Sequence, residues 1–316
     1  MQILYHPDGT ISKIDTSPLK SLSIDFLNWY CPIHRYVWLM RHDGTLKSGT
    51  CGQNLIHNSR YPFWSNQSPI KTTNNFCKAN RGACSCGSDL DSPKAISQEI
   101  YEEFVTKIRT VGRDVEKSLS NYDGKKIIAI GRLHKILDST AEIHIDIGKK
   151  CNFDCSYCPS GVHDNFSPFM SLETINNGLN IIEKHSGIIS NKTGIITGGE
   201  PTLFKELPKL LQMLKEKNFN EIKINTNGTG SYRVYSNILQ DKNIKLDLTF
   251  HYEFTTEKII KKCNKLKEEF GDQITLKVLS RTTDFVDIVN QYTTKYQQFP
   301  IYEKHDGVHN IIKIQK

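Results

Sequence analysis

Long apolar stretches are missing from this sequence. No window of about 18 consecutive apolar residues occurs, so we expect no membrane-spanning helix. The first residues, Met-Gln-Ile-Leu-Tyr-His, offer neither the basic start nor the apolar core of a signal peptide, which favours a cytoplasmic protein. The C-terminal half also lacks a stripe of Lys and Arg with interleaved aromatic residues, which argues against nucleic acid as a partner.

The composition that remains is that of a globular protein. The 316 residues are 37% hydrophobic and 24% charged, which is enough for a substantial buried core in one large domain or two. The net charge of +7 is a mild excess that permits an anionic partner without requiring one. Much of the lysine lies in predicted helices, where a solvent-exposed face accounts for it.

Nine cysteines are spread unevenly along the chain, and three of them form a tight array. Cys151, Cys155 and Cys158 follow a C-x3-C-x2-C spacing directly after a strand-like run. Three thiolates can hold three irons of a [4Fe-4S] cube and leave the fourth iron open to a small molecule. Such an open iron indicates chemistry more than electron storage. The alternative is a zinc site, which wants a fourth ligand such as His163.

Residues 1–94 are predicted to form a domain rich in β-strands and loops. Asp-Gly pairs at 8–9 and 43–44 lie between strand-like runs and predict hairpins, because such turns need positive φ. A long polar segment at 53–91 follows, and a loop of this length needs a source of order. Four cysteines in this region are candidate ligands for an Fe–S cluster or zinc. They are Cys51, Cys77, Cys84 and Cys86.

Residues 95–139 are expected to connect this domain to the rest of the chain through a helix. Apolar residues recur every three or four positions over 95–120 and predict one long helix. Asp91-Ser92-Pro93 is its expected start. The segment from Asn121 to Gly124 is its expected end.

From residue 140 to residue 316 the pattern alternates between strand and helix. The predicted strands cover 142–148, 193–198, 221–227, 245–252, 274–280 and 299–304. The predicted helices cover 171–186, 205–217, 231–241, 254–270 and 284–297. Five or six βα units in series imply an α/β fold whose parallel sheet has right-handed crossovers.

The predicted strands alternate apolar and polar residues, whereas parallel strands covered on both faces usually read as apolar runs. In the first strand, Ile143, Ile145 and Ile147 are interleaved with polar residues. Because successive side chains point to opposite faces, helices should cover an apolar face and a polar face should line a space for ligand. A partial (βα)6 TIM-like barrel fits this pattern, with its chemistry at the C-terminal ends of the strands.

A Gly-Gly-Glu-Pro turn ends the second predicted strand, at the same mouth of the barrel as the cysteine array. Gly198 and Gly199 let a backbone approach a ligand closely. Glu200, followed by Pro201, offers a carboxylate that accepts hydrogen bonds from an ammonium group. Alone, such a turn is common. Its place beside the cysteines makes it a candidate part of the site.

Taken together, these features resemble the radical S-adenosylmethionine (SAM) superfamily. The likeness rests on the cysteine array after the first strand, an aromatic residue before its last cysteine, the Gly-Gly-Glu-Pro turn and the βα series, over about residues 140–300. It implies that Cys151, Cys155 and Cys158 ligate a [4Fe-4S] cluster whose open iron binds SAM. The implied SAM contacts are Tyr157, Gly198, Gly199, Glu200, Pro201, Asn225, Asn227, Thr249 and His251.

The resemblance also implies a reaction and a partner. A reduced cluster passes one electron to SAM, which gives methionine and a 5′-deoxyadenosyl radical, and that radical abstracts hydrogen from a substrate. The electron comes from a donor such as flavodoxin or ferredoxin. No residue of the sequence stands out as a catalytic acid or as a radical-quenching group.

The N-terminal cysteines resemble the SPASM/twitch auxiliary-cluster modules of the same superfamily, placed here before the barrel. They imply a second Fe–S cluster and a peptide or protein substrate. Zinc and free thiols remain alternatives for these cysteines, and a nucleoside or another small molecule remains an alternative substrate. A non-enzymatic Fe–S or zinc protein for electron transfer is the third interpretation.

Overall fold

The computed structural model describes most of the chain. The described residues are 2–14, 24, 26–49, 54–60, 62–65, 92–115, 119–138, 140–158, 161, 163–186, 191–279, 301–305 and 308–312. The chain divides into two compact units, one made of 1–144 and 176–192 and the other of 145–175 and 193–316. None of the helices in the described part of the chain has the length and apolar character needed to cross a bilayer.

The first unit contains a sheet of short strands. Its strands are β1 (Gln2–Tyr5), β2 (Ile11–Ile14), β6 (Lys94–Ala95), β7 (Ser120–Asn121) and β8 (Ala129–Arg132), in the order β6-β8-β1-β2-β7. The hairpin predicted around residues 8–9 is confirmed. β1 and β2 pair antiparallel, with Tyr5 opposite Ile11, and Gly9 turns at a φ of +75°.

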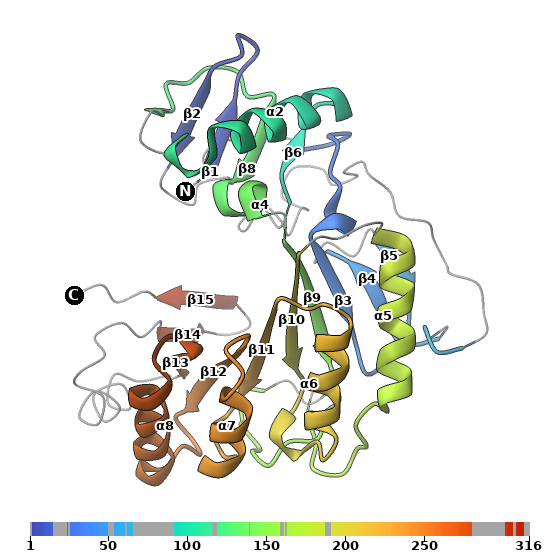
Figure 1. Ribbon diagram of the computed structural model, residues 1–316, viewed down its shortest axis with the longest axis vertical. Helices are drawn as coiled ribbons and strands as arrows, with labels where there is room; N and C mark the ends of the chain where they lie inside the picture. The colour runs from blue at the N-terminus through green and yellow to red at the C-terminus, as the bar shows by residue number, and fades with distance from the viewer. Residues whose placement is uncertain are drawn as a thin grey trace. The chain divides into compact units, whose positions relative to one another are not determined.

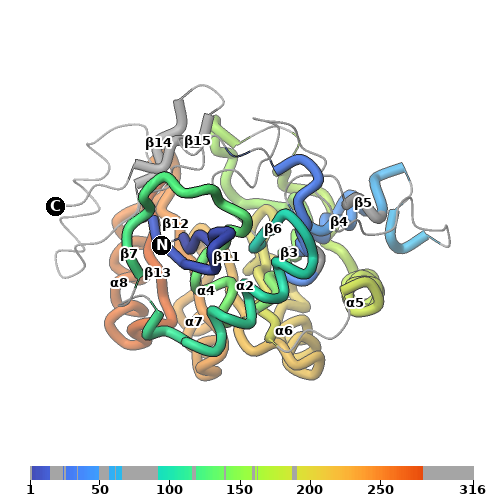
Figure 2. Tube along the Cα trace, turned by 90° about the horizontal axis from the view of Figure 1, so that it is seen from above, coloured from blue at the N-terminus to red at the C-terminus, as the bar shows by residue number. Residues whose placement is uncertain are grey.

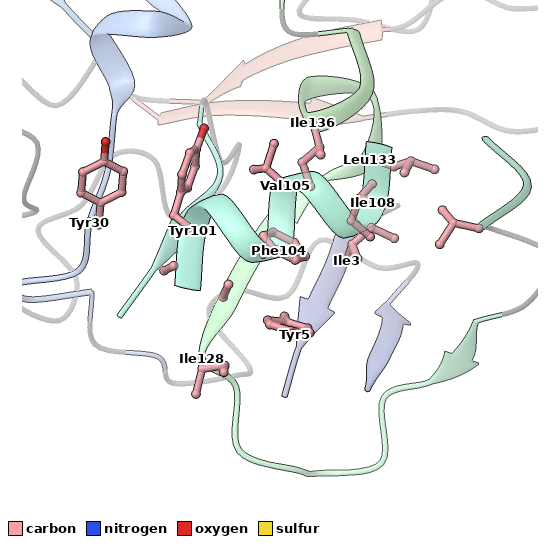
Figure 3. Close-up of a cluster of buried hydrophobic side chains, with 13 residues drawn as sticks. Ile3, Tyr5, Tyr30, Tyr101, Phe104, Val105, Ile108, Ile128, Leu133 and Ile136 are labelled. Atoms are coloured by element: carbon pink, nitrogen blue, oxygen red, sulfur yellow. The ribbon is translucent and has the colours of Figure 1, made fainter. Parts of the chain in front are cut away.

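Helix α2 (Gln98–Val111) packs on this sheet through one apolar face. Its buried residues form a core with residues of β1 and β8 (Figure 3). Those labelled in the figure include Ile3, Tyr5, Tyr101, Phe104, Val105 and Ile108. Residues 95–139 therefore contribute a helix and the strand β8 to the first unit, along with the short helix α4 (Leu133–Asp138).

The helix predicted over 95–120 is shorter than expected. Its first turn is capped by Ser97, whose Oγ accepts a hydrogen bond from Ile100 N at 3.3 Å. It ends at Gly112, which takes a φ of +69° and leads into the 3-10 turn η3 (Gly112–Asp114). A glycine adopts positive φ without strain and so stops the helix, although the apolar spacing continues beyond it.

A second strand group of the first unit follows the order β9-β3-β4-β5. These strands are β9 (Thr140–Asp146), β3 (Val37–Met40), β4 (Leu46–Ser48) and β5 (Asn54–His57), with the turn η1 (Ile33–Arg35) before β3. The hairpin predicted around residues 43–44 is confirmed, since β3 and β4 pair antiparallel and Gly44 has a φ of +89°. Helix α5 (Leu172–Ser186) approaches β3 closely at Gly178, where a Cβ would lie 2.5 Å from Met40 Cε.

The second unit is built from parallel strands in chain order. They are β10 (Asn191–Thr197), β11 (Glu221–Thr226), β12 (Ile244–His251), β13 (Ile274–Leu279) and β14 (Ile301–His305), and β15 (Val308–Ile312) joins the edge antiparallel. Each neighbouring pair from β10 to β14 is parallel. The α/β fold with a parallel sheet is confirmed, and its strands lie within a few residues of the predicted bounds. The predicted helix at 284–297 lies outside the described residues.

Helices α6 (Leu207–Glu216), α7 (Tyr232–Leu239) and α8 (Glu257–Phe270) cover one face of these strands (Figures 1 and 2). Short 3-10 turns, η4 (Pro201–Leu203) and η5 (Gly271–Gln273), lie before α6 and after α8. Burial alternates along β11 to β13, as predicted. Leu246, Leu248 and Phe250 are fully buried, and each such side chain contributes about 1.5–3 kcal/mol relative to exposure. The other face keeps the half-buried polar residues of the strands.

Candidate active site

The cysteine array lies in a loop whose two ends are held together. β9 leads into residues 147–150, and Cys151 N then donates to Asp164 O at 2.6 Å. Asp164 N donates in turn to Lys149 O at 3.1 Å. Within the loop, Cys158 N donates to Cys155 O at 2.9 Å and closes a tight turn. These bonds place all three thiols at the carboxyl end of the first parallel strand.

The Gly-Gly-Glu-Pro turn supports the base of this loop. Gly199 N donates to Gly148 O at 2.7 Å, and Glu200 N donates to Lys150 O at 2.8 Å. A Cβ on Gly199 would lie 2.2 Å from Lys150 O, and one on Gly198 would lie 2.5 Å from Gly148 O. Both glycines are therefore required by close backbone approach. The partner in that approach is the chain just before Cys151.

We expect Gly199→Ala to displace the cysteine loop. The added methyl group overlaps a backbone carbonyl, which cannot move aside as a flexible side chain can. We expect a loss of about 1–3 kcal/mol of unfolding free energy, together with loss of most of the iron bound after anaerobic reconstitution. Gly161→Ala is the matched control, because a Cβ there meets no atom within 4 Å. Equal iron content in the two variants would contradict the prediction.

A cavity of about 360 Å³ opens at the carboxyl ends of the strands. Ten residues that the sequence singles out line it together. They are Cys151, Cys155, Tyr157, Cys158, Gly198, Gly199, Asn225, Asn227, Thr249 and His251. His163, which the sequence offered only as a fourth zinc ligand, also lines it, and four further lining residues were not singled out as candidates: Asp146, Phe153, Thr197 and Thr226. Asp146 lies on the polar alternation of its strand, and Thr197 directly precedes the glycine turn, so these signals were present in the sequence.

Glu200 does not line the cavity, although the resemblance implied a contact with the SAM amino group. The residue is fully buried. Its Oε1 accepts from Thr202 N at 3.0 Å, Thr202 Oγ1 at 2.6 Å and Thr226 Oγ1 at 2.7 Å, and its Oε2 accepts from Asn227 N at 2.8 Å. Pro201 is also buried and outside the lining. The carboxylate thus ties the end of β10 to the end of β11 and positions Asn227 in the cavity wall.

Tyr157 and His251 pack against each other at the cavity. The Tyr157 ring stacks on the His251 ring at 6.0 Å and on the Tyr252 ring at 5.5 Å. Burial lowers the pKa of His251 to about 4, so the imidazole is neutral near pH 7. Burial also raises the pKa of Tyr157, which keeps its proton. The Tyr157 hydroxyl therefore donates to His251 Nδ1, at 2.5 Å.

Glu253, which follows β12, accepts hydrogen bonds from the cysteine loop and so fixes its backbone. Its carboxylate accepts from Ser156 N at 2.7 Å, from Tyr252 Oη at 2.7 Å and from Ser156 Oγ. Ser156 lies between two of the array cysteines. The carboxylate therefore fixes the backbone that presents Cys155 and Tyr157, which are the residues on either side.

We expect Glu253→Ala to lower the affinity of the loop for iron by about 10–100-fold, the usual cost of removing a group that orients metal ligands. Glu253→Gln keeps an oxygen for the Ser156 N–H and should lose less. Iron retained after challenge with a chelator measures the effect. Glu257→Ala is the control, because Glu257 pairs with Lys261 on the surface of α8. If Glu253→Ala retains as much iron as this control, Glu253 does not hold the loop.

The thiols have the environment of ligands for a cluster. Burial raises the pKa of Cys151, and it raises the pKa of Cys155 to about 11. Without metal these thiols are neutral, so iron binding has to displace their protons. Among the described residues, no three His, Cys, Asp or Glu side chains meet around one point as the ligands of a single ion do. The three thiols instead surround a cavity within the usual range of about 300–1,000 Å³ for small-molecule sites, which fits a cluster with a small ligand.

The other cysteines lie elsewhere. Cys51, Cys77, Cys84 and Cys86, the candidate auxiliary ligands, fall outside the described residues. Cys263 is fully buried on the apolar face of α8, where it contributes to core packing.

Fold and site define an α/β enzyme in which parallel strands present three thiols and several polar side chains to one cavity. Residues 145–275 match the family model described as the radical SAM superfamily. The match covers every residue that lines the cavity, so residues 145–275 carry a radical SAM domain. Members of the superfamily use a [4Fe-4S] cluster and SAM, and the thiols and polar residues around the cavity fit both groups.

Curated proteins that resemble the chain match only part of it. A probable GTP 3′,8-cyclase of Methanocaldococcus jannaschii is 36% identical over 87 residues, which are 27% of this chain and 28% of that protein. A probable GTP 3′,8-cyclase of Sulfolobus acidocaldarius is 29% identical over 87 residues, which are 28% of this chain and 26% of that protein. The chain thus spans about a quarter of the length of these relatives.

Solved structures give more distant likenesses. SuiB of Streptococcus suis, bound to precursor peptide SuiA, is similar with a TM-score of 0.41 and 16% identity, over 64% of this chain and 52% of that chain. The protein anSMEcpe with bound AdoMet gives a TM-score of 0.40 and 18% identity, over 54% of both chains. These two likenesses are too remote to carry an argument about the site.

Proposed function

We propose that this protein is a cytoplasmic enzyme that cleaves SAM reductively and abstracts a hydrogen atom from a substrate. The observation that carries the proposal is the gathering of Cys151, Cys155 and Cys158 with the polar ends of three strands around one cavity. When bound, the cluster and SAM supply the one-electron chemistry. A reducing compartment keeps such clustered thiols available for iron.

The residues of the chain bind and orient the cofactors in this proposal. The three cysteines hold three corners of the cluster. Asn225, Asn227 and Thr249 offer polar groups to SAM from the ends of β11 and β12. The half-buried His251 and the buried Tyr157 form an aromatic wall beside Cys155. Such a wall excludes water, which protects a reactive centre from side reactions.

The test is formation of 5′-deoxyadenosine by the anaerobically reconstituted protein with SAM and dithionite. We expect one 5′-deoxyadenosine for each methionine released. Flavodoxin or ferredoxin, as the proposed donor, should replace dithionite. If the reconstituted protein binds iron but forms no 5′-deoxyadenosine with either reductant, the proposal is wrong and a binding or electron-transfer role takes its place.

For the substrate we propose a peptide or protein. The support is the N-terminal group Cys51, Cys77, Cys84 and Cys86, whose arrangement in sequence resembles auxiliary-cluster modules. A nucleotide is the second candidate, because the partial matches among curated proteins include probable GTP 3′,8-cyclases. Incubation with GTP or with peptides encoded beside the gene separates the two. The true substrate should increase the amount of 5′-deoxyadenosine formed, and its own mass should change during the reaction.

The auxiliary cluster can be tested by counting iron. We propose that the N-terminal cysteines bind a second Fe–S cluster. One cube contains about four irons, so the reconstituted chain should hold more than that number. The double variant Cys84→Ala, Cys86→Ala should then lose the excess and keep the rest. An iron content unchanged by this double substitution would rule out the second cluster.

A further inference from the structure

A cysteine outside the array and a lysine meet in the core of the first unit. Lys94 on β6 is 1% exposed and Cys31 is 7% exposed. Lys94 Nζ lies 2.7 Å from Cys31 Sγ and 5.9 Å from the centre of the Phe26 ring. The Oγ of Ser92, which is also fully buried, lies 3.3 Å from the same sulfur. A thiol, an amine and a hydroxyl thus share one water-poor site.

The backbone holds the cysteine and the lysine opposite each other. Tyr30 and Ala95 form an antiparallel bridge, in which Tyr30 N donates to Ala95 O at 2.7 Å and Ala95 N donates to Tyr30 O at 3.1 Å. Cys31 and Lys94 are the next pair along the two bridged segments, so the bridge sets their register. The neighbouring Tyr30 is itself buried in the core of this unit (Figure 3). The contact is therefore built by main-chain pairing as well as by side-chain packing.

The separation between the two atoms is short for a hydrogen bond to sulfur. N–H···O bonds are about 2.9–3.0 Å long, and sulfur is a larger acceptor than oxygen, so N–H···S bonds are longer. The separation of 2.7 Å instead suits nitrogen and sulfur joined through one oxygen atom. We propose that Cys31 and Lys94 are the site of a peroxide-dependent covalent cross-link, N–O–S, which no part of the radical SAM chemistry requires.

The chemistry balances with a peroxide as the named oxidant. One hydrogen peroxide takes the thiol to a sulfenic acid and leaves water. A second takes the amine, which reacts in its uncharged form, to a hydroxylamine and again leaves water. The hydroxylamine oxygen then displaces water from the sulfenic acid. Sulfur and nitrogen each lose two electrons, each peroxide gains two, and the S–H bond and one N–H bond are replaced by S–O and N–O.

The cross-link would join the two ends of the segment that contains the candidate auxiliary ligands. Residues 31 and 94 flank the segment that contains Cys51, Cys77, Cys84 and Cys86. A covalent bond between its ends reduces the freedom of that segment in the unfolded state. The first unit should therefore be more stable to heat after oxidation, and a thiol reductant should reverse the change.

The experiment uses the full chain, purified anaerobically with reductant and divided into two samples. One sample receives hydrogen peroxide, and both are then denatured, alkylated, digested with trypsin and analysed by mass spectrometry. We expect the treated sample to contain a peptide pair joining Cys31 to Lys94. Its mass should equal the summed masses of the two unmodified peptides plus one oxygen atom and minus two hydrogen atoms. Dithiothreitol should cleave the bond and separate the two peptides. Most of the alkylated Cys31 should disappear in parallel.

Two variants and one contrary result make the test decisive. Cys31→Ser and Lys94→Met should each abolish the joined peptide, and wild-type Tm should rise on oxidation while theirs does not. If wild-type Cys31 is recovered after peroxide as a free thiol, a sulfinic acid or a disulfide, and no joined peptide is found, the proposal is overturned. This contrary result is obtained from the wild-type chain alone, so it counts even if a variant folds poorly.

Discussion

Cys155→Ala is expected to abolish 5′-deoxyadenosine formation. The thiol lies in the cavity wall, 3.7 Å from His251 Nδ1, and two cysteines cannot hold a cube that has already left one iron without a protein ligand. Because chemistry depends on that cluster, the loss should be complete within detection, with iron content falling in parallel. Anaerobic reconstitution followed by iron analysis and chromatography of the SAM products measures both.

Cys263→Ala is the matched control for this substitution. Cys263 on α8 belongs to the same unit and is also buried, but its sulfur packs against Gly228 and does not line the cavity. We expect it to cost about 1 kcal/mol of stability, as an ordinary core truncation does, and to keep its iron and activity. Full activity in Cys155→Ala would show that the array is not the cluster site.

The strands of the second unit could be predicted because their signal is local. Residues such as Leu246 and Leu248 alternate with polar neighbours, and alternation depends only on the geometry of a strand. The helix predicted over 95–120 ran past the observed end of α2 for the opposite reason. Its apolar spacing continued past Gly112, and only the positive φ of that glycine shows where the helix ends.

The contacts that build the site were harder to predict because they join distant segments. Gly199 was expected to approach a ligand, and the structure places it in the cavity lining and also close against the backbone of Lys150. Glycine in a turn signals a close approach but does not name the partner. The pairing of Cys31 with Lys94 has no sequence signal at all, since it depends on a bridge between residues 30 and 95.

Substitutions of Glu200 separate two roles for its carboxylate, which are direct contact with SAM and support of the cavity wall. We expect Glu200→Gln to destabilise the cofactor-free protein by about 1–3 kcal/mol, because an amide turns one acceptor oxygen into a donor facing buried donors. Glu200→Ala should cost more, since four donors then lose their partner and each unsatisfied buried donor costs about 1–3 kcal/mol. Denaturant unfolding of the protein without iron or SAM measures both values.

The same carboxylate sets the position of Asn227, so the apparent KM for SAM should rise in Glu200→Gln as a secondary effect. Thr202→Val is the companion variant. It removes one of the donors to Glu200 without touching the cavity lining, so it should show part of the stability loss and little change in KM. A Glu200→Gln protein with wild-type stability and a raised KM would mean that the carboxylate meets SAM directly. Loss of stability without cofactors would instead assign Glu200 to the framework that joins the ends of β10 and β11.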